Sequence, residues 1–135
     1  MCMLTNQAWA RTATRDIVCY KIVNRYEHPF VLASEVYNFS YELGKEYTEI
    51  SFKSVSHSSV LATLKNEVSI GFHSYKRYRD AKAVKFNHRR VVMKCIIPKG
   101  SLYFEGTNGI EGYCSEKIRV VGYQDEGKRG WITES

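Results

Sequence analysis

Short runs of β-branched and apolar residues, each bounded by polar or turn residues, recur along the chain and predict β-strands. Residues 17–23 form one such run between Asp16 and Asn24. Residues 90–97 form the strongest run, which ends at the turn signal Pro98-Lys99-Gly100. Further extended segments are expected at 37–41, 46–52, 68–73, 102–104 and 117–123. The glycines between residues 107 and 112 predict a loop.

Helical spacing is clearest between residues 76 and 88, where Tyr78, Ala81 and Val84 recur every three residues and are expected to face a core. Residues 53–66 are serine-rich and then only weakly helical. Because no alternation of strands and helices is present, we expect an α+β fold: a single compact domain with mixed or antiparallel sheets and one or two helices. The expected domain covers residues 16–123, with an N-terminal arm at 1–15 and a C-terminal tail at 124–135.

Length and composition fit one soluble domain, because the chain has 135 residues, of which 44% are hydrophobic and 25% are charged. No apolar run approaches the ~18 residues that cross a bilayer, and the first 16 residues contain no apolar stretch long enough for a secretion signal. We therefore expect a cytoplasmic protein with no membrane partner. The cysteines lack metal-ligand spacing, so no metal site and no resident cofactor is expected and the thiols are predicted to be free: Cys2, Cys19, Cys95 and Cys114.

A net charge of +6 favours an anionic partner if the charge is concentrated. Between Lys76 and Arg90 the chain has seven Lys or Arg residues and one acid, with aromatic residues interleaved. Cations beside aromatic rings suit a phosphate and a base, although a solvated helix face would have the same composition. The candidate ligand-binding residues lie at the end of the 68–73 strand and along the basic segment: His73, Ser74, Tyr75, Arg79, Lys82, Arg89 and Arg90.

No catalytic set follows from spacing. His73 and Ser74 are neighbours on an expected strand, so their side chains point to opposite faces and form no nucleophile–base pair. The glycines make no phosphate-binding loop, and no helix-turn-helix, zinc finger or RNP motif is present.

The order of several short motifs resembles the ADP-ribosyltransferase fold over residues 17–123. The matching segments are Tyr20-Lys21, Gly71-Phe72-His73-Ser74-Tyr75 before a helix with Ala81, Ile97-Pro98-Lys99-Gly100, and Ser115-Glu116-Lys117-Ile118. The resemblance implies that Lys21 lies near a nicotinamide dinucleotide, that Ser74 and Tyr75 belong to the second motif, and that Glu116 is the catalytic residue. Two positions depart from the family: Lys21 stands for an Arg or His, and Glu116 is single where many toxins carry a pair.

The chain also resembles small proteins of gut Bacteroidota and their phages that carry "MC-x-x-T", "YK", "GFHS" and "C-x-I-P-x-G" motifs. The counterparts here are Met1 to Thr5, Tyr20-Lys21, Gly71 to Tyr75 and Cys95 to Phe104. This resemblance implies a protein of a phage or mobile element that acts in the cytoplasm of the host cell.

Three functions remain open. The first is non-enzymatic sequestration of an anionic nucleotide, either ADP-ribose-like or a cyclic-nucleotide immune signal, by an anti-defence protein that forms homo-oligomers. The second is an ADP-ribosyltransferase or NAD glycohydrolase that uses Glu116, with NAD as its substrate. The third is an interaction module that binds nucleic acid or protein through the basic 76–90 segment.

Overall fold

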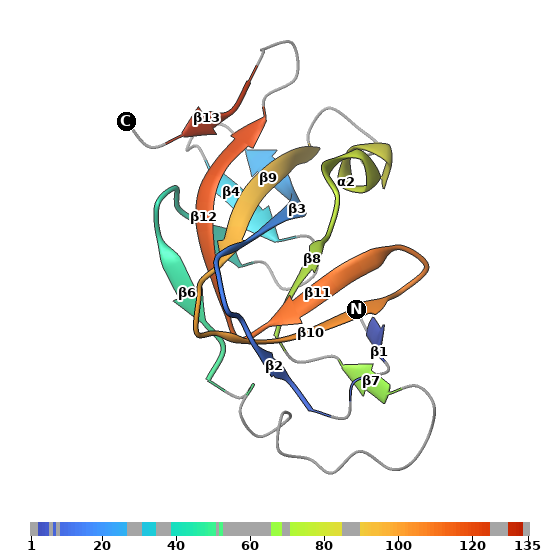
Figure 1. The fold of residues 1–135 in the computed structure, drawn as a ribbon. Coiled ribbons are helices and arrows are strands. Elements are labelled where there is room, and N and C mark those ends of the chain that lie inside the picture. Colours follow the sequence, from blue (N-terminus) through green and yellow to red (C-terminus); the bar gives the residue numbers. More distant parts are fainter. Residues whose placement is uncertain are drawn as a thin grey trace.

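The computed structural model describes residues 3–5, 7, 9–26, 31–34, 39–50, 52, 66–68, 71–84, 90–124 and 130–133. Their strands form one 13-stranded sheet, whose main path runs β13-β12-β9-β3-β8-β11-β10-β1-β7 (Figure 1). In chain order the strands are β1 (Met3–Thr5), β2 (Arg11–Thr12), β3 (Ile17–Tyr26), β4 (Val31–Ser34), β5 (Ser40–Tyr41), β6 (Glu46–Thr48), β7 (Asn66–Val68), β8 (Phe72–Tyr75), β9 (Arg90–Ile97), β10 (Leu102–Thr107), β11 (Glu111–Ser115), β12 (Lys117–Gln124) and β13 (Ile132–Thr133). The helix α2 (Tyr78–Val84) lies between β8 and β9.

The prediction of an α+β fold with one or two helices is wrong, because the fold is dominated by antiparallel sheet. Every strand pairing within the described part of the chain is antiparallel, and α2 is a seven-residue helix beside this sheet. One source of the error is the loop expected at 107–112: it overlaps the start of strand β11, Glu111–Ser115, which the sequence analysis did not predict. Gly112 lies inside β11 because it lets the neighbouring strand approach: a Cβ there would meet the Ser74 carbonyl oxygen at 2.4 Å.

Several local predictions are confirmed. The segments expected at 17–23, 90–97 and 117–123 correspond to β3, β9 and β12, and the helical spacing at 76–88 corresponds to α2. Three cysteines are free and buried, namely Cys19, Cys95 and Cys114, whereas Cys2 lies outside the described residues. The weakly helical stretch at 53–66 also falls almost entirely outside them.

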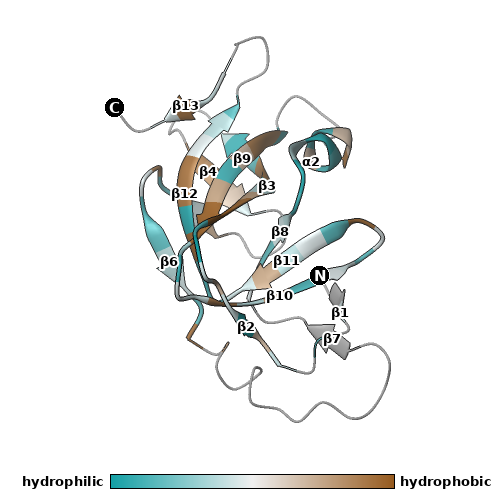
Figure 2. Cartoon of the chain, viewed as in Figure 1, coloured by the Kyte–Doolittle hydropathy of each residue, from teal (hydrophilic) through white to brown (hydrophobic). Residues whose placement is uncertain are grey.

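The main core lies on one face of β3, β9 and β12. Cys19 is paired with Cys95, and Val23 with Val91, so that alternate residues of both strands point to the same side. Figure 2 shows hydrophobic positions recurring along these strands. The fully or nearly buried members of this core are Cys19, Val23, Leu32, Tyr41, Val91, Met93, Cys95, Ile97, Tyr113, Ile118, Val120 and Tyr123.

The strands β8, β11 and β10 form the other part of the sheet. The β8 and β3 strands share the pair Tyr20–Tyr75, and the β10–β11 hairpin runs across the direction of β9 and β12 (Figure 1). Tyr113 of this hairpin reaches the main core, while a second, smaller core forms from Phe52, Phe104 and Cys114. The two parts thus enclose apolar side chains between them.

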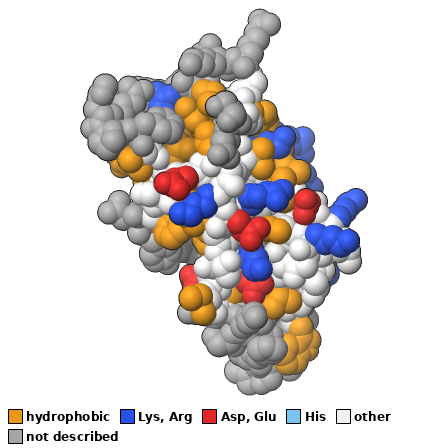
Figure 3. Space-filling model, turned by 90° about the vertical axis from the view of Figure 1, so that its left-hand side faces the viewer, with side chains coloured by type: hydrophobic (Ala, Val, Ile, Leu, Met, Phe, Trp, Pro, Cys, Tyr) orange, Lys and Arg blue, Asp and Glu red, His pale blue; other side chains and the backbone are white. Residues whose placement is uncertain are grey.

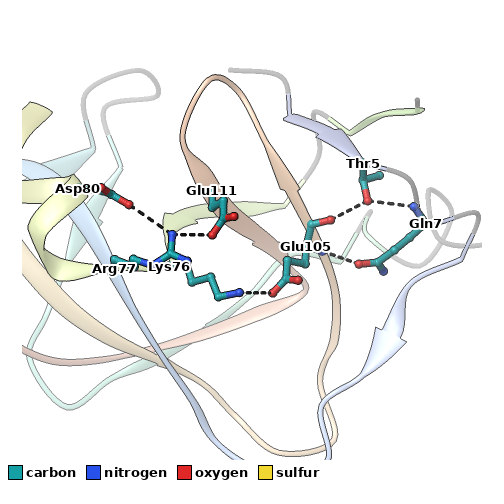
Figure 4. A network of polar contacts seen from close by, with 7 residues as sticks. All are labelled: Thr5, Gln7, Lys76, Arg77, Asp80, Glu105 and Glu111. Atoms are coloured by element: carbon teal, nitrogen blue, oxygen red, sulfur yellow. Dashed lines mark hydrogen bonds and ion pairs between the residues drawn. The ribbon is translucent and has the colours of Figure 1, made fainter. Parts of the chain in front are cut away.

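Both ends of the chain add strands to the sheet. Within the expected N-terminal arm, β1 and β2 pair with β10, and within the expected tail, β13 pairs with β12. The Thr5 hydroxyl donates to the Glu105 carbonyl at 2.7 Å and accepts the Gln7 amide at 3.1 Å (Figure 4). No helix among the described residues is long and apolar enough to cross a membrane.

Candidate ligand-binding surface

The face of the sheet opposite the main core carries α2 and several aromatic rings. Strand alternation places Tyr20 and its cross-strand partner Lys94 on this face, because Cys19 and Cys95 beside them point into the core. Helix α2 packs over β3, β8 and β9 with Ala81 fully buried beneath it. The helix predicted from the sequence spacing therefore covers part of this face of the sheet.

Three rings from distant parts of the chain meet here, and we call Tyr20, Tyr78 and Trp131 the ring triad. The Tyr20 and Tyr78 ring centroids are 5.8 Å apart, and the Tyr78 and Trp131 centroids are 5.6 Å apart, both in edge-to-face arrangements. The Tyr20 and Trp131 centroids are 6.0 Å apart, with an interplanar angle of 30°. These separations fall in the favourable range for aromatic pairs, and all three residues remain half-buried.

Two lysine ammonium groups border the ring triad. Lys82 Nζ lies 5.8 Å from the Tyr78 ring centroid, and Lys94 Nζ lies 5.8 Å from the Trp131 ring centroid. Such cation–π contacts contribute ~0.5–1 kcal/mol each at exposed sites. The Tyr78 hydroxyl donates to the side-chain oxygen of Gln124. The triad is therefore an apolar platform with positive charge and polar groups at its edge.

Burial raises the pKa of Tyr20 above its ordinary value of 10.0, and the neighbouring Cys19 and Tyr78 act in the same direction. The Tyr20 hydroxyl consequently stays protonated at neutral pH. The platform thus adds no negative charge that would repel an anion.

Three of the residues predicted from the sequence lie on or beside this surface. Lys82 borders the triad, Arg79 is exposed on α2, and Tyr75 is paired with Tyr20 in the sheet, so its side chain points to the same face. Arg90 begins β9, where it is paired with Asn24. Arg89 lies outside the described residues.

Lys21 and Ser74 point the other way, toward the main core. Lys21 Nζ donates to the His73 carbonyl oxygen and lies 5.9 Å from the Tyr41 ring centroid. The Ser74 hydroxyl is buried beside the Cys19 thiol; burial raises the pKa of that thiol, and the contact with Ser74 acts in the opposite direction. The structure therefore brings these two residues together, but on the face opposite the ring triad.

His73 has a neighbour that the sequence did not suggest. Its Nε2 atom lies 3.7 Å from the Cys114 sulfur, because the two residues are paired between β8 and β11. Burial raises the pKa of Cys114 from 9.0 to about 12, so the group remains a thiol and is not activated as a nucleophile. Recognition of β11 as a strand would have placed Cys114 on the His73 face.

Glu116 is buried at the junction of β11 and β12. Its backbone N–H donates to the Leu102 carbonyl at 2.9 Å, and its carbonyl accepts the Glu49 N–H at 2.8 Å. Only Ser115 separates it along the chain from Cys114, the neighbour of His73. This junction lies at the start of β12, whereas β13 and the neighbouring Trp131 lie at the other end of that strand.

Other charges of the basic segment already have acidic partners. Lys76 Nζ pairs with Glu105 at 3.2 Å, and Arg77 pairs with Glu111 and Asp80 (Figure 4). On the molecular face shown in Figure 3, Lys and Arg side chains are likewise interspersed with Asp and Glu side chains. The basic segment is therefore less available as a continuous positive strip than its composition suggests.

No protein-family model, curated protein or solved structure matches this chain. Both resemblances seen in the sequence stay predictions.

Proposed function

We propose that this protein binds an anionic nucleotide, with a base stacked on the ring triad and phosphate oxygens held by nearby cations, and that it does so without chemistry. The observation that supports this most is the ring triad bordered by two ammonium groups. A stacked base contributes ~1–3 kcal/mol, and charge-assisted hydrogen bonds add to it. The cations assigned to phosphate are Lys82, Lys94 and Arg79.

The spacing of the triad favours a base on its outer surface. Carbon atoms in contact are ~3.5–4.0 Å apart, so a base between two parallel rings needs the rings roughly 7 Å apart. The triad centroids are 5.6–6.0 Å apart, so the rings contact one another instead. One base therefore stacks against one side of the cluster, which suits a free nucleotide.

The proposal extends to the biological role implied by the sequence resemblance to phage proteins. A protein that holds a signalling nucleotide without consuming it lowers the free concentration of that signal in the host cell. The candidate ligands are ADP-ribose-type and cyclic nucleotides, and a homo-oligomer would present several copies of the site.

The experiment is a calorimetric titration with NAD, ADP-ribose, a cyclic ADP-ribose isomer, a cyclic dinucleotide and a cyclic trinucleotide, with recovery of the ligand afterwards. At least one nucleotide should bind and be recovered intact, and Trp131→Ala should weaken it by about 5- to 150-fold. Lys94→Gln should also weaken binding. Lys45→Gln is the matched control, because Lys45 Nζ lies 5.6 Å from the Tyr47 ring centroid, away from the triad.

The two other functions give different results in the same experiments. Release of nicotinamide from NAD, abolished by Glu116→Gln, would support the enzyme. Binding of single-stranded RNA that falls steeply with salt would support the interaction module, since several phosphate contacts produce a steep dependence. The ion pairs of Lys76 and Arg77 favour the nucleotide, because they leave fewer cations for an extended backbone.

A further inference from the structure

The third ring of the triad is held by the last strand of the sheet. Trp131 immediately precedes β13, and β13 has two residues, which pair with β12 through Gly122–Thr133 and Tyr123–Ile132. Tyr20 and Tyr78, by contrast, lie on the long strand β3 and on α2. The position of Trp131 therefore depends on whether this short strand is paired.

Gly122 provides the space into which β13 fits. A Cβ atom at Gly122 would lie 2.6 Å from the Ile132 carbonyl oxygen and 3.0 Å from Thr133 Cγ2. The first contact is with backbone, so β13 would have to move as a whole. The φ angle of Gly122 is not in the positive region that favours glycine, so its backbone conformation does not itself require glycine.

The strand β12 is irregular at the same point. The register between β12 and β9 shifts between Val120 and Gly122, as at a β-bulge. Tyr123 then points into the main core, and Ile132 packs against that core from β13. The irregularity thus ends where β13 begins to pair.

We propose that Gly122 is a positioning residue for the ligand site: its missing side chain allows β13 to pair with β12, and this pairing sets Trp131 against the other two rings. The effect on ligand binding rests on the proposed function, whereas the effect on Trp131 does not. Because a ligand stacked on Trp131 also stabilises paired β13, binding and strand pairing strengthen each other by the same factor.

The test uses the full chain with Trp9→Phe, so that tryptophan emission reports Trp131 alone. Gly122→Ala should shift the Trp131 emission to longer wavelength and increase its quenching by acrylamide. Gly109→Ala is the control, because a Cβ there meets nothing within 4 Å and the strain from its φ of +100° falls in the turn between β10 and β11, not at β13. It should leave the emission unchanged.

Ligand affinity gives the second measurement. With the nucleotide that binds best, Gly122→Ala should weaken binding by up to the 5- to 150-fold expected for Trp131→Ala. The variant that combines Gly122→Ala with Trp131→Ala should bind the nucleotide no more weakly than Trp131→Ala alone, because both changes remove the same contact. A double variant that is weaker than Trp131→Ala would refute the positioning role.

The outcomes separate the two proposals. Unchanged emission in Gly122→Ala would overturn the positioning role, whatever the affinity. Shifted emission together with a wild-type protein that binds no nucleotide would support the positioning role and refute the proposed function. If Gly122→Ala does not fold, Ile132→Gly replaces it: loss of the side chain that packs against the core should release β13 and shift the emission, and unchanged emission would again overturn the inference.

Discussion

The buried thiols predict that stability falls steeply in alkaline solution. Burial raises the pKa of Cys19 from 9.0 to about 11 and that of Cys114 from 9.0 to about 12, and it raises the pKa of Cys95 in the same direction. In the unfolded chain these thiols titrate near pH 9. The folded protein therefore retains protons that the unfolded chain loses.

The direction in which the free energy of unfolding changes with pH follows from the number of protons bound in each state. Below pH 9 both states hold the thiol protons, so the contribution to stability is complete. Between pH 9 and 11 the unfolded state binds fewer protons, so the free energy of unfolding falls as pH rises. Each thiol contributes ~1.4 kcal/mol per pH unit, so Cys19 and Cys114 together withdraw on the order of 3 kcal/mol per unit. Over two pH units this amounts to about 5 kcal/mol, a large share of the roughly 5–15 kcal/mol by which a domain is usually stable.

Urea unfolding followed by circular dichroism at pH 7, 9, 10 and 10.5, with a reductant present, measures this loss. The free energy of unfolding should change little up to pH 9 and then fall. Cys114→Ala should lower the slope by ~1.4 kcal/mol per unit, since one titrating group is removed. A free energy that stays constant from pH 9 to 10.5, or a slope unaffected by Cys114→Ala, would refute the argument.

Two further substitutions test how the sheet is assembled. Gly112→Ala should lower the free energy of unfolding by ~1–3 kcal/mol, because its Cβ would meet the Ser74 carbonyl oxygen at 2.4 Å; an unchanged urea midpoint would contradict the close approach of β8 and β11. Thr5→Val should cost ~1–3 kcal/mol by removing the hydroxyl bonded to the Glu105 carbonyl and the Gln7 amide, whereas the exposed Thr12→Val should cost little; equal urea midpoints for the two variants would contradict a stabilising role of these two hydrogen bonds.

The sequence predicted the central strands well because their signal is local. The β-branched run at 90–97 and its Pro-Lys-Gly turn coincide with β9 (Arg90–Ile97). Strand β11 was missed because Gly112 has the local character of a loop, and its reason for being glycine is a contact with β8, which is distant in sequence. Because β11 forms an antiparallel hairpin with β10, its omission made the predicted fold less rich in sheet than the observed one.

The candidate site could be predicted only in part, for a similar reason. The basic, aromatic character of the 76–88 segment pointed to Lys82, which borders the ring triad, and to Arg79, which is exposed on the same helix. Alternation along β3 could also have shown that Lys21 and Tyr20 point to opposite faces. The meeting of Tyr20 with Trp131, however, depends on the β13–β12 pairing, and no local pattern at either residue indicates that contact.

The proposed function requires that the ring triad and its lysines hold a nucleotide without converting it. The most direct measurement is calorimetric titration of wild type, Trp131→Ala and Lys45→Gln with the nucleotide panel, followed by analysis of the recovered ligand. We expect one nucleotide to bind equally well to wild type and Lys45→Gln, to bind Trp131→Ala about 5- to 150-fold more weakly, and to be recovered intact. Equal affinity of wild type and Trp131→Ala, or no binding of any nucleotide, would contradict the proposed function.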